Sequence, residues 1–402
     1  MLKVRSFLSA VLFASTLAFV LTAFAKQSEI SNTTLPDKWL TTSMSNRPES
    51  RVSHSAVWTG QEMIIWGGET GTPGTVNTGY RYNPKTDSWS PITTTTAPAA
   101  RRFHSAIWTG SEMIIWGGEG SNSGPTYGNG GKYNPVADTW LPITTTNAPI
   151  GRYLHAAVWT GSEMLVWGGD TVSPDVVPTN TGGRYDPVTD TWLPITVTNA
   201  PISRTLPIGV WAETQLLIWG GAIDYQCACT GLNTGARYDP LTDTWIPMTT
   251  TNVPSGVLSA NALWVGHDLI VWGGWTIVLT YTNTGARYNP TLDTWTLIQS
   301  AGAPSGRESA SAVWNGEDMI IWGGYDGSRL NTGGRYNLAN DSWISTTLVS
   351  APDPRNGHTA VWTGYEMIVW SGYDSNEPPH TLSTGGRYYL WASRLFLPLM
   401  LK

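Results

Sequence analysis

The 402-residue chain is poor in cysteine, and its only two cysteines, Cys227 and Cys229, are separated by the single residue Ala228. In an oxidising compartment, this pair predicts a small strained disulfide, a local staple of one loop, or two spare thiols. A metal site would need further ligands, and no histidine stands near these cysteines in the sequence. We therefore expect neither a metal ion nor another cofactor.

Basic residues are also scarce. The chain has 23 Lys and Arg against 29 Asp and Glu, which gives a formal net charge of −6. Proteins that bind nucleic acid favour a basic patch. The composition therefore excludes nucleic acid as the expected partner.

Long apolar runs are confined to the N-terminus. The run from Phe7 to Leu21 follows Lys3 and Arg5 and precedes Ala23-Phe24-Ala25. A basic start, an apolar centre and a small-x-small end predict a cleaved secretory signal peptide over residues 1–25. A retained membrane anchor is the alternative. No second apolar run of about 18 residues follows, so we expect no integral membrane span after cleavage. The predicted location is secreted, periplasmic or cell-surface.

The two ends flank the predicted domain. Residues 26–36 form a short polar leader, and residues 392–402 form an apolar tail that is too short to span a bilayer. The tail either adds a strand, packs on the end of the domain, or serves in export or surface sorting. We expect the domain itself to cover residues 37–391.

The chain is rich in a repeated Trp-Gly-Gly motif. Successive copies lie 48 to 53 residues apart, and the seventh copy is altered to Trp370-Ser371-Gly372. A fixed period of this size indicates a repeat architecture. The six unaltered copies begin at Trp66, Trp116, Trp167, Trp219, Trp272 and Trp322.

Each repeat contains four short runs of β-branched and aromatic residues, and no segment has a sustained helical period. In the first repeat these runs are 54–58, 62–66, 78–82 and 87–92, separated by Gly, Asn and Pro. Four antiparallel strands repeated seven times predict an all-β, seven-bladed propeller, in which each four-stranded sheet packs on its neighbours.

The repeat is similar to the kelch repeat. One unit shows the resemblance in full: Met164-Leu165-Val166-Trp167-Gly168-Gly169, then Gly183-Arg184-Tyr185-Asp186-Pro187, then Asp190-Thr191-Trp192. The resemblance spans residues 37 to 391 and is closest to exported bacterial kelch propellers of the galactose oxidase central-domain-like superfamily. It implies the fold strongly and the function weakly, because one fold hosts many functions.

The ends of the repeat series predict how the ring closes. Asp37-Lys38-Trp39 matches the start of a fourth strand, such as Asp138-Thr139-Trp140, but precedes the first complete unit. The last unit lacks this strand. We therefore expect the N-terminal strand to complete the seventh blade, which leaves no open sheet edge. A closed ring in one chain also leads us to expect a monomer.

The repeats diverge mainly in the loops between their second and third strands. Function in a repeat scaffold resides where the repeats differ, so we expect these loops to form the ligand-binding face. The candidate ligand-binding residues are Arg102, Tyr153, Trp275, Tyr281, Glu308, Tyr325, Asp326, Arg329 and Tyr373.

Two regular positions near this face have a structural explanation. An Arg stands seven residues before the first-strand Trp in six repeats, and a His stands four before it in four repeats. We expect the arginines to bond backbone carbonyls and the histidines to pack between blades, although histidines on adjacent inner strands could also bind a metal. The histidines are His54, His104, His155 and His358.

Two enzymatic alternatives follow from the resemblance. Galactose oxidase-like proteins use copper with a crosslinked Cys and Tyr, for which Cys227 and Cys229 are poorly placed. Bacterial sialic-acid epimerases are kelch propellers with acid–base groups at the channel mouth, a role open to Glu308, Arg102 or Asp326. The catalytic residues stay unknown. The prediction is a non-enzymatic propeller that binds a protein or a glycan, and the alternative is a carbohydrate-active enzyme such as a sugar epimerase.

Overall fold

The computed structural model describes residues 37–71, 74–121, 124–172, 176–223, 231–276, 280–376 and 380–390, and within them every regular element is a β-strand. The predicted signal peptide, leader, apolar tail and both cysteines lie outside the described residues. No described segment forms a helix long and apolar enough to cross a membrane. Residues Asp37–Tyr389 form one compact unit.

Seven four-stranded antiparallel sheets make up this unit, as the repeat predicts. In blade 1, Ile64 and Ile65 on the second strand are fully buried, because both faces of that strand are covered by neighbouring blades.

Blade 1 contains β3 (Ser55–Trp58), β4 (Met63–Trp66), β6 (Gly79–Asn83) and β7 (Ser88–Pro91). Blade 2 contains β8 (Ser105–Trp108), β9 (Met113–Trp116), β10 (Gly130–Asn134) and β11 (Thr139–Pro142). Blade 3 contains β12 (Ala156–Trp159), β13 (Met164–Trp167), β16 (Gly182–Asp186) and β17 (Thr191–Ile195).

The remaining blades repeat this order. Blade 4 contains β18 (Ile208–Ala212), β19 (Gln215–Trp219), β20 (Gly235–Asp239) and β21 (Thr244–Pro247). Blade 5 contains β22 (Asn261–Val265), β23 (Asp268–Trp272), β24 (Gly285–Asn289) and β25 (Thr294–Ile298). Blade 6 contains β26 (Ser311–Trp314), β27 (Asp318–Trp322), β28 (Gly333–Asn337) and β29 (Ser342–Ser345). Two short pairs lie outside these sheets: β2 (Arg51–Val52) with β5 (Glu69–Thr70), and β14 (Asp170–Val172) with β15 (Val176–Pro178).

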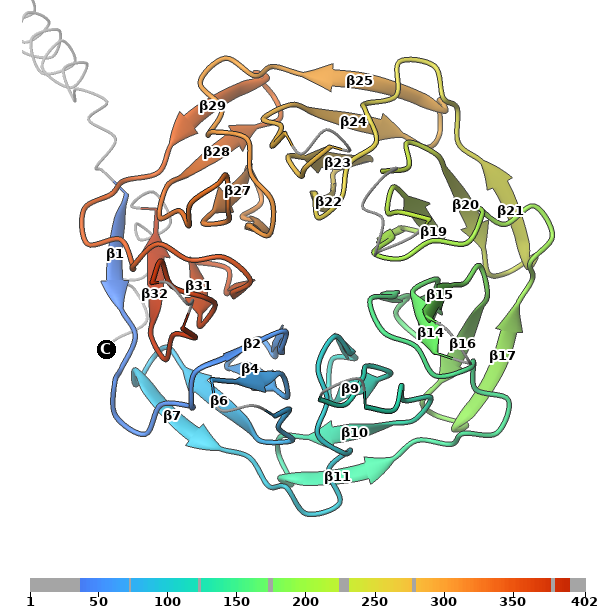
Figure 1. Cartoon of the computed structure of the whole chain (residues 1–402), viewed down its shortest axis with the longest axis horizontal. Helices are drawn as coiled ribbons and strands as arrows, with labels where there is room; N and C mark the ends of the chain where they lie inside the picture. Colours follow the sequence, from blue (N-terminus) through green and yellow to red (C-terminus); the bar gives the residue numbers. More distant parts are fainter. Residues whose placement is uncertain are drawn as a thin grey trace, which may run out of the picture. The chain divides into compact units, whose positions relative to one another are not determined.

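Blade 7 joins the two ends of the repeat series and confirms the predicted closure. It contains β1 (Lys38–Thr41), β32 (Gly385–Tyr389), β31 (Glu366–Trp370) and β30 (Thr359–Trp362), in that order across the sheet. Trp39 on β1 lies opposite Tyr388 on β32, with their ring centroids 5.0 Å apart. The Tyr388 hydroxyl also donates a hydrogen bond to Asp37. Figure 1 shows β1 beside β32, so the first strand of the chain completes its last blade.

Tryptophan pairs hold consecutive blades together. The Trp that ends each second strand packs against the fourth-strand Trp of the following blade, as Trp66 does against Trp140 with centroids 5.5 Å apart. Trp322 contacts Trp39 at 4.9 Å, so the same contact spans the closure. Such pairs contribute about 0.5–1.5 kcal/mol each beyond the apolar area they bury. The other five pairs are Trp116–Trp192, Trp167–Trp245, Trp219–Trp295, Trp272–Trp343 and Trp370–Trp89.

The diglycine allows the chain to turn closely past the next segment. Gly68 has a φ of +93°, and a Cβ on it would lie 2.5 Å from the Val52 carbonyl oxygen. Only glycine fits there without strain. The first glycine is less restricted: Ser371 replaces it in blade 7 with a φ of +64°, and its hydroxyl bonds the carbonyl of Arg51 at 2.5 Å.

Candidate functional site

Six buried arginines organise the loops at one face of the ring. Arg152, which is fully buried, donates from Nη1 to the carbonyls of Gly168 (3.1 Å) and Thr181 (2.7 Å) and from Nη2 to the Thr181 hydroxyl. Burial lowers the pKa of this guanidinium to about 10, so it stays charged at neutral pH. The carbonyl of Arg152 accepts from the Gly118 amide of the previous blade. The arginines therefore have the structural role that their repetition predicts. The other five are Arg51, Arg101, Arg204, Arg307 and Arg355.

Beside each arginine position, three residues per blade pair through their backbones and form what we call the rim. In blade 6, Glu308 pairs with Tyr325, which pairs with Arg329. The three residues are the one after the arginine position, the one after the diglycine, and one from the second–third loop. These are the positions at which the repeats diverge. The rim sets of blades 1 to 7 are Val52–Glu69–Thr75, Arg102–Glu119–Thr126, Tyr153–Asp170–Pro178, Thr205–Ala222–Gly231, Leu258–Trp275–Tyr281, Glu308–Tyr325–Arg329 and Asn356–Tyr373–Thr381.

One ion cluster on the rim joins blades 1 and 2. Arg102 donates to Glu119 of its own blade at 2.9 Å and to Glu69 of the preceding blade at 2.5 Å. Its guanidinium also lies over the Phe103 ring, 5.1 Å from the centroid. Arg102 therefore joins the two blades. Because one guanidinium binds two carboxylates, the cluster carries an excess of negative charge.

A second cluster, on blades 5 and 6, combines aromatic rings with a carboxylate. The Tyr281 and Tyr325 rings meet edge to face with centroids 5.8 Å apart, and the Arg329 guanidinium lies 5.6 Å from the Tyr325 centroid. Burial raises the pKa of Glu308, and burial followed by the charge of Glu308 raises the pKa of Tyr281. Among the described residues, the half-buried Glu308 side chain has no hydrogen bond or ion pair.

The structure brings most of the predicted site residues onto the rim, with different surroundings. Arg329 donates to Asn356 of blade 7 at 3.2 Å. Tyr373 lies near enough to Arg329, Arg102 and Glu69 for their charges to act on it, although burial is the main cause of its raised pKa. Tyr153 is only 9% exposed and lies beside Phe103, with centroids 6.3 Å apart, so it offers little surface to a ligand.

Asp326 lies just past the rim. It accepts hydrogen bonds from Ser305 (3.0 Å) and Ser328 (3.3 Å). Trp275 pairs with Leu258 and Tyr281 through its backbone and stays half-buried. The three acid–base candidates thus have different surroundings. Arg102 binds two carboxylates, Glu308 forms no hydrogen bond or ion pair with the described residues, and Asp326 accepts hydrogen bonds from two serines.

Next to the rim, a ring of residues that we call the collar lies where neighbouring blades approach each other. The Phe103 amide donates to the Ser53 carbonyl (3.2 Å), and the Leu154 amide donates to the Phe103 carbonyl (3.3 Å). Each collar residue has a φ between +49° and +65°, a conformation that is uncommon outside glycine. The collar consists of Ser53, Phe103, Leu154, Leu206, Ser259, Ser309 and Gly357.

A cavity of about 320 Å³ opens beside the apolar part of the collar. Its volume is at the lower end of the range typical of small-ligand sites. Blades 2 to 5 supply its walls. The lining residues are Phe103, His104, Leu154, His155, Leu206, Pro207, Ile208, Gly221, Val257, Ser259 and Ala260.

In four other blades a histidine stands at the position of Ala260, and two of these histidines, His104 and His155, line the cavity. His104 Nε2 lies 2.9 Å from the Ser55 hydroxyl, and His358 Nε2 lies 2.9 Å from that of Ser311. Burial, with the Arg355 charge, lowers the pKa of His358 to about 3, so this imidazole is neutral. Among the described residues, no group of three or more His, Cys, Asp or Glu could hold a metal ion. The histidines therefore act as spacers between blades.

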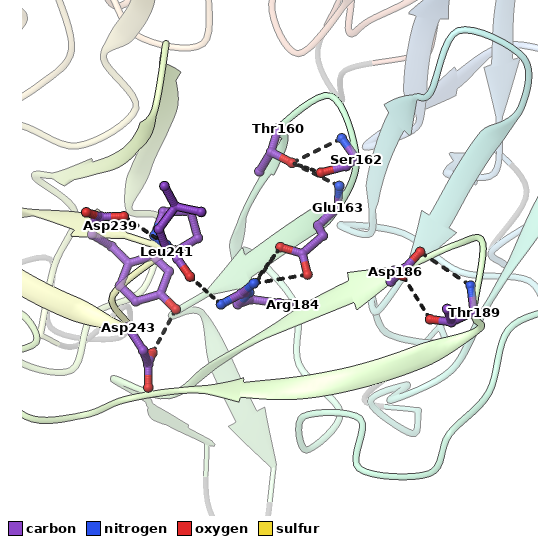
Figure 2. A network of polar contacts seen from close by, with 11 residues as sticks. Thr160, Ser162, Glu163, Arg184, Asp186, Thr189, Asp239, Leu241 and Asp243 are labelled. Carbon is purple, nitrogen blue, oxygen red and sulfur yellow. Dashed lines mark hydrogen bonds and ion pairs between the residues drawn. The ribbon is translucent and has the colours of Figure 1, made fainter.

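The opposite face is built from repeated structural contacts. Figure 2 shows that Arg184 pairs with Glu163 (2.9 Å) and that Asp186 caps its own turn at Thr189; Arg184 also donates to the carbonyl of Pro240 in the next blade. A cavity of about 340 Å³ on this face is lined by exposed groups such as His267 and Glu213, which bond each other. The polar groups of this face are thus used within the ring.

Sequence reasoning places Glu69 and Glu119 on this face but misses three features of the region: the pairing of both carboxylates with Arg102, the collar, and the cavity. One signal could have located the cavity. Blade 5 is the only repeat with neither the Arg nor the His, because Val257 and Ala260 stand at those two positions. Both residues line the cavity.

The chain matches a protein-family profile over most of its length. The profile of the KLHDC2/KLHL20/DRC7 Kelch-repeats domain matches residues 30–141, 104–302 and 259–384, which together cover most of the chain. A search of curated proteins found no match. The matched profile agrees with the seven four-stranded blades and with the diglycine, Tyr and Trp positions of each repeat. The chain belongs to the kelch-repeat β-propeller family.

Proposed function

We propose that this protein is an exported, non-enzymatic scaffold that binds a protein partner through the rim. A kelch propeller is a fold suited to protein binding. One observation carries the proposal: the positions at which the seven repeats differ come together as a continuous set around one face, while the opposite face repeats the same contacts. Diverging residues on a conserved scaffold are typical of a binding surface.

The residues of the rim suit such a surface. Trp275, Tyr325 and Tyr373 are half-buried aromatic residues, and Arg329 lies among them. Aromatic residues and arginine dominate the binding energy of protein interfaces. These side chains lie on loops rather than in the tryptophan-packed core, so their substitution leaves the fold intact.

The test uses the chain without residues 1–25 and a partner captured from the organism's own extracellular or envelope proteins. We expect Tyr325→Ala and Arg329→Ala each to weaken binding at least tenfold while the melting temperature changes by less than about 2 °C. Lys85→Ala, an exposed position on the opposite face, is the matched control. Weaker binding by the Lys85 variant, with the rim variants unaffected, contradicts the proposal. A glycan that competes at the rim would replace the protein partner as the ligand.

Export and a monomeric state belong to the same proposal. The N-terminal sequence supports export, and closure of the ring within one chain supports a monomer. Fractionation of cells that express the full chain, followed by mass determination of its N-terminus, tests cleavage after Ala25. Light scattering of the mature protein tests for a mass of one chain.

One observation favours a sugar-converting enzyme as the second candidate. Glu308 is a half-buried carboxyl whose pKa is raised by burial, which is a property of general acids and bases. Turnover of a sugar substrate that is lost in Glu308→Gln would favour this candidate over the scaffold.

A further inference from the structure

The cavity arises because blade 5 departs from the repeat at two positions. Where a histidine is present, its imidazole packs on the first glycine of the previous blade: a Cβ on Gly117 would lie 2.6 Å from His155 Cε1. The equivalent residue over Gly220 is Ala260. The nearest atoms to a Cβ on Gly220 are two carbonyl oxygens 3.8 Å away, those of Leu232 and Val257.

Most of the side chains that line the cavity are apolar, and polar atoms make up about half of its exposed surface. Leu206, Ile208 and Val257 line it together with Phe103 and Leu154. Its volume of about 320 Å³ is sufficient for one large aliphatic or aromatic side chain. Such a side chain would be removed from water on entering, which is favourable by about 25 cal/mol per Å² of apolar surface buried.

A carboxylate stands on the rim one blade beyond the blade 5 wall of the cavity. Leu258, between the lining residues Val257 and Ser259, pairs with Trp275, and Trp275 pairs with Tyr281. The Tyr281 ring contacts that of Tyr325, with centroids 5.8 Å apart, and Tyr325 pairs with Glu308 on the adjacent blade. The basic residues of the rim are already engaged, Arg102 with two glutamates and Arg329 with Asn356 and the Tyr325 ring. A cation beside the apolar group therefore has Glu308 as its counter-ion and the tyrosine rings as further partners.

We propose that the blade 5 cavity binds an apolar side chain of a partner polypeptide, and that Glu308 pairs with a Lys or Arg adjacent to that side chain. This inference rests on the proposed function, because it specifies what the partner presents to the rim. It assigns the cavity to the apolar residue, and the Glu308–Tyr281–Tyr325 cluster to the cation.

The test uses the mature chain and three fluorescent hexapeptides, Gly-Gly-Phe-Lys-Gly-Gly, Gly-Gly-Phe-Glu-Gly-Gly and Gly-Gly-Gly-Lys-Gly-Gly, in polarisation titrations. We expect the Phe-Lys peptide to bind at least tenfold more tightly than either of the other two. Equal binding of the Phe-Glu peptide overturns the role of Glu308. Equal binding of the Gly-Lys peptide, or no binding of any peptide, overturns the role of the cavity.

A repeat-based substitution separates the cavity from the fold. Ala260→His introduces the residue that four blades already carry, and its imidazole fills the space over Gly220. We expect this variant to keep its melting temperature and to lose Phe-Lys binding at least tenfold. Ala310→His makes the same change in blade 6, away from the residues that line the cavity, and is the matched control. Unchanged binding by the Ala260 variant overturns the proposal.

The two proposals fail in different ways. Glu308→Gln should remove the preference for Lys over Glu in the peptides, whereas Arg329→Ala tests the rim with the whole partner. If Arg329→Ala weakens partner binding but Ala260→His and Glu308→Gln change nothing, the scaffold function stands and the cavity has no part in it. If all three leave partner binding unchanged, both proposals are wrong.

Discussion

The junctions between blades in the arc from blade 6 to blade 3 differ from the junction between blades 4 and 5. In the arc, each junction has a buried arginine, a histidine, and a hydroxyl next to the imidazole, such as that of Thr359, 2.9 Å from His54. The histidine packs on the first glycine of the previous blade at three of these junctions, and Ser371 replaces that glycine at the fourth. At the blade 4–5 junction, Val257, Ala260 and Ile208 occupy these three positions. The fold tolerates the loss of all three, because blades 4 and 5 are still joined by the tryptophan pair Trp219–Trp295, by the apolar cluster around it and by the hydrogen bond from Arg237 to the Pro290 carbonyl.

The comparison separates two kinds of contact in the ring. Tryptophan packing is present at every junction and holds the blades together. The arginine and histidine contacts order the loops near the rim, and where they are missing the ring gains a cavity. A junction that has lost its polar spacers is thus both the least constrained and the one with room for a ligand.

The largest expected effect comes from removing one buried arginine. Arg152→Met leaves the buried Gly168 carbonyl without its donor, and the Thr181 carbonyl keeps only the Gly168 amide. An unsatisfied buried group costs about 1–3 kcal/mol, and each lost hydrogen bond to a charged group costs about 1.5–3 kcal/mol. We expect the free energy of unfolding, measured by urea denaturation, to fall by about 3–5 kcal/mol. Arg329→Met, the same change on the rim, should cost less than about 1 kcal/mol. Equal costs for the two variants would show that the buried arginine contacts do not stabilise the junctions.

The histidine spacers predict a dependence on pH. The pKa of His358 is about 3 in the folded protein and close to 6.5 when unfolded, so only the unfolded chain gains the proton between these values. Stability is therefore expected to fall as the pH falls from about 6.5 towards 3. His358→Gln should make this dependence less steep in thermal denaturation at several pH values, because the amide does not titrate. The rest of the dependence comes from His54, His104 and His155, whose pKa values burial also lowers. His267→Gln, at an exposed position, should follow the wild type.

A smaller effect, and this time a gain in stability, is expected when a histidine spacer is introduced in blade 6. The Asn261 Nδ2 atom is buried and has no hydrogen-bond partner among the described residues. Asn261 stands where Ser311 receives His358 one blade later, so the imidazole of Ala310→His would lie next to this amide. We expect a gain of about 1 kcal/mol in the free energy of unfolding. The gain should vanish in an Asn261→Ala background, and its persistence there would exclude the amide as its cause.

The smallest effect concerns the carboxyl on the rim. Burial raises the pKa of Glu308 above the value in the unfolded chain. Ionised Glu308 therefore destabilises the fold at a pH above the unfolded pKa, and this destabilisation disappears as the pH falls and the carboxyl becomes protonated. Tyr281, Tyr325, Asp326 and Arg329 face the same cluster. Thermal denaturation of Glu308→Gln should show a gain of less than about 1 kcal/mol in the free energy of unfolding at pH 7 and no change at pH 3.5. Destabilisation at pH 7 would mean that the carboxylate has a stabilising partner.

Periodicity predicted the fold from the sequence almost completely. The Trp-Gly-Gly spacing gave seven blades, and Asp37 with Trp39 gave the closing strand, because these features recur in register with the strands. The prediction that the variable loops share one face, where the rim lies, rests on the same comparison of the repeats.

The contacts within the rim could not be predicted. Arg102 bonds a glutamate from its own blade and one from the blade before, and Tyr153 is buried beside the collar. Both outcomes depend on how neighbouring blades meet and on backbone conformations with positive φ, neither of which a periodic pattern specifies. The cavity results from residues missing at two positions, which becomes visible only when all repeats are aligned against a structure.

The pairing of β1 with β32 has a consequence for how the chain folds. The contact between Asp37 and Tyr388 joins residues 351 positions apart, so the last sheet cannot form until nearly the whole domain has been synthesised. Closing so long a loop is entropically costly and slow, while the strands within each other blade are close in sequence and pair early. Blades 1 to 6 can therefore form as an open arc, and the final sheet acts as a late, rate-limiting step. Detachment of β1 would leave blade 7 without its outer strand, so the strength of the β1–β32 pairing contributes to the lifetime of the folded state.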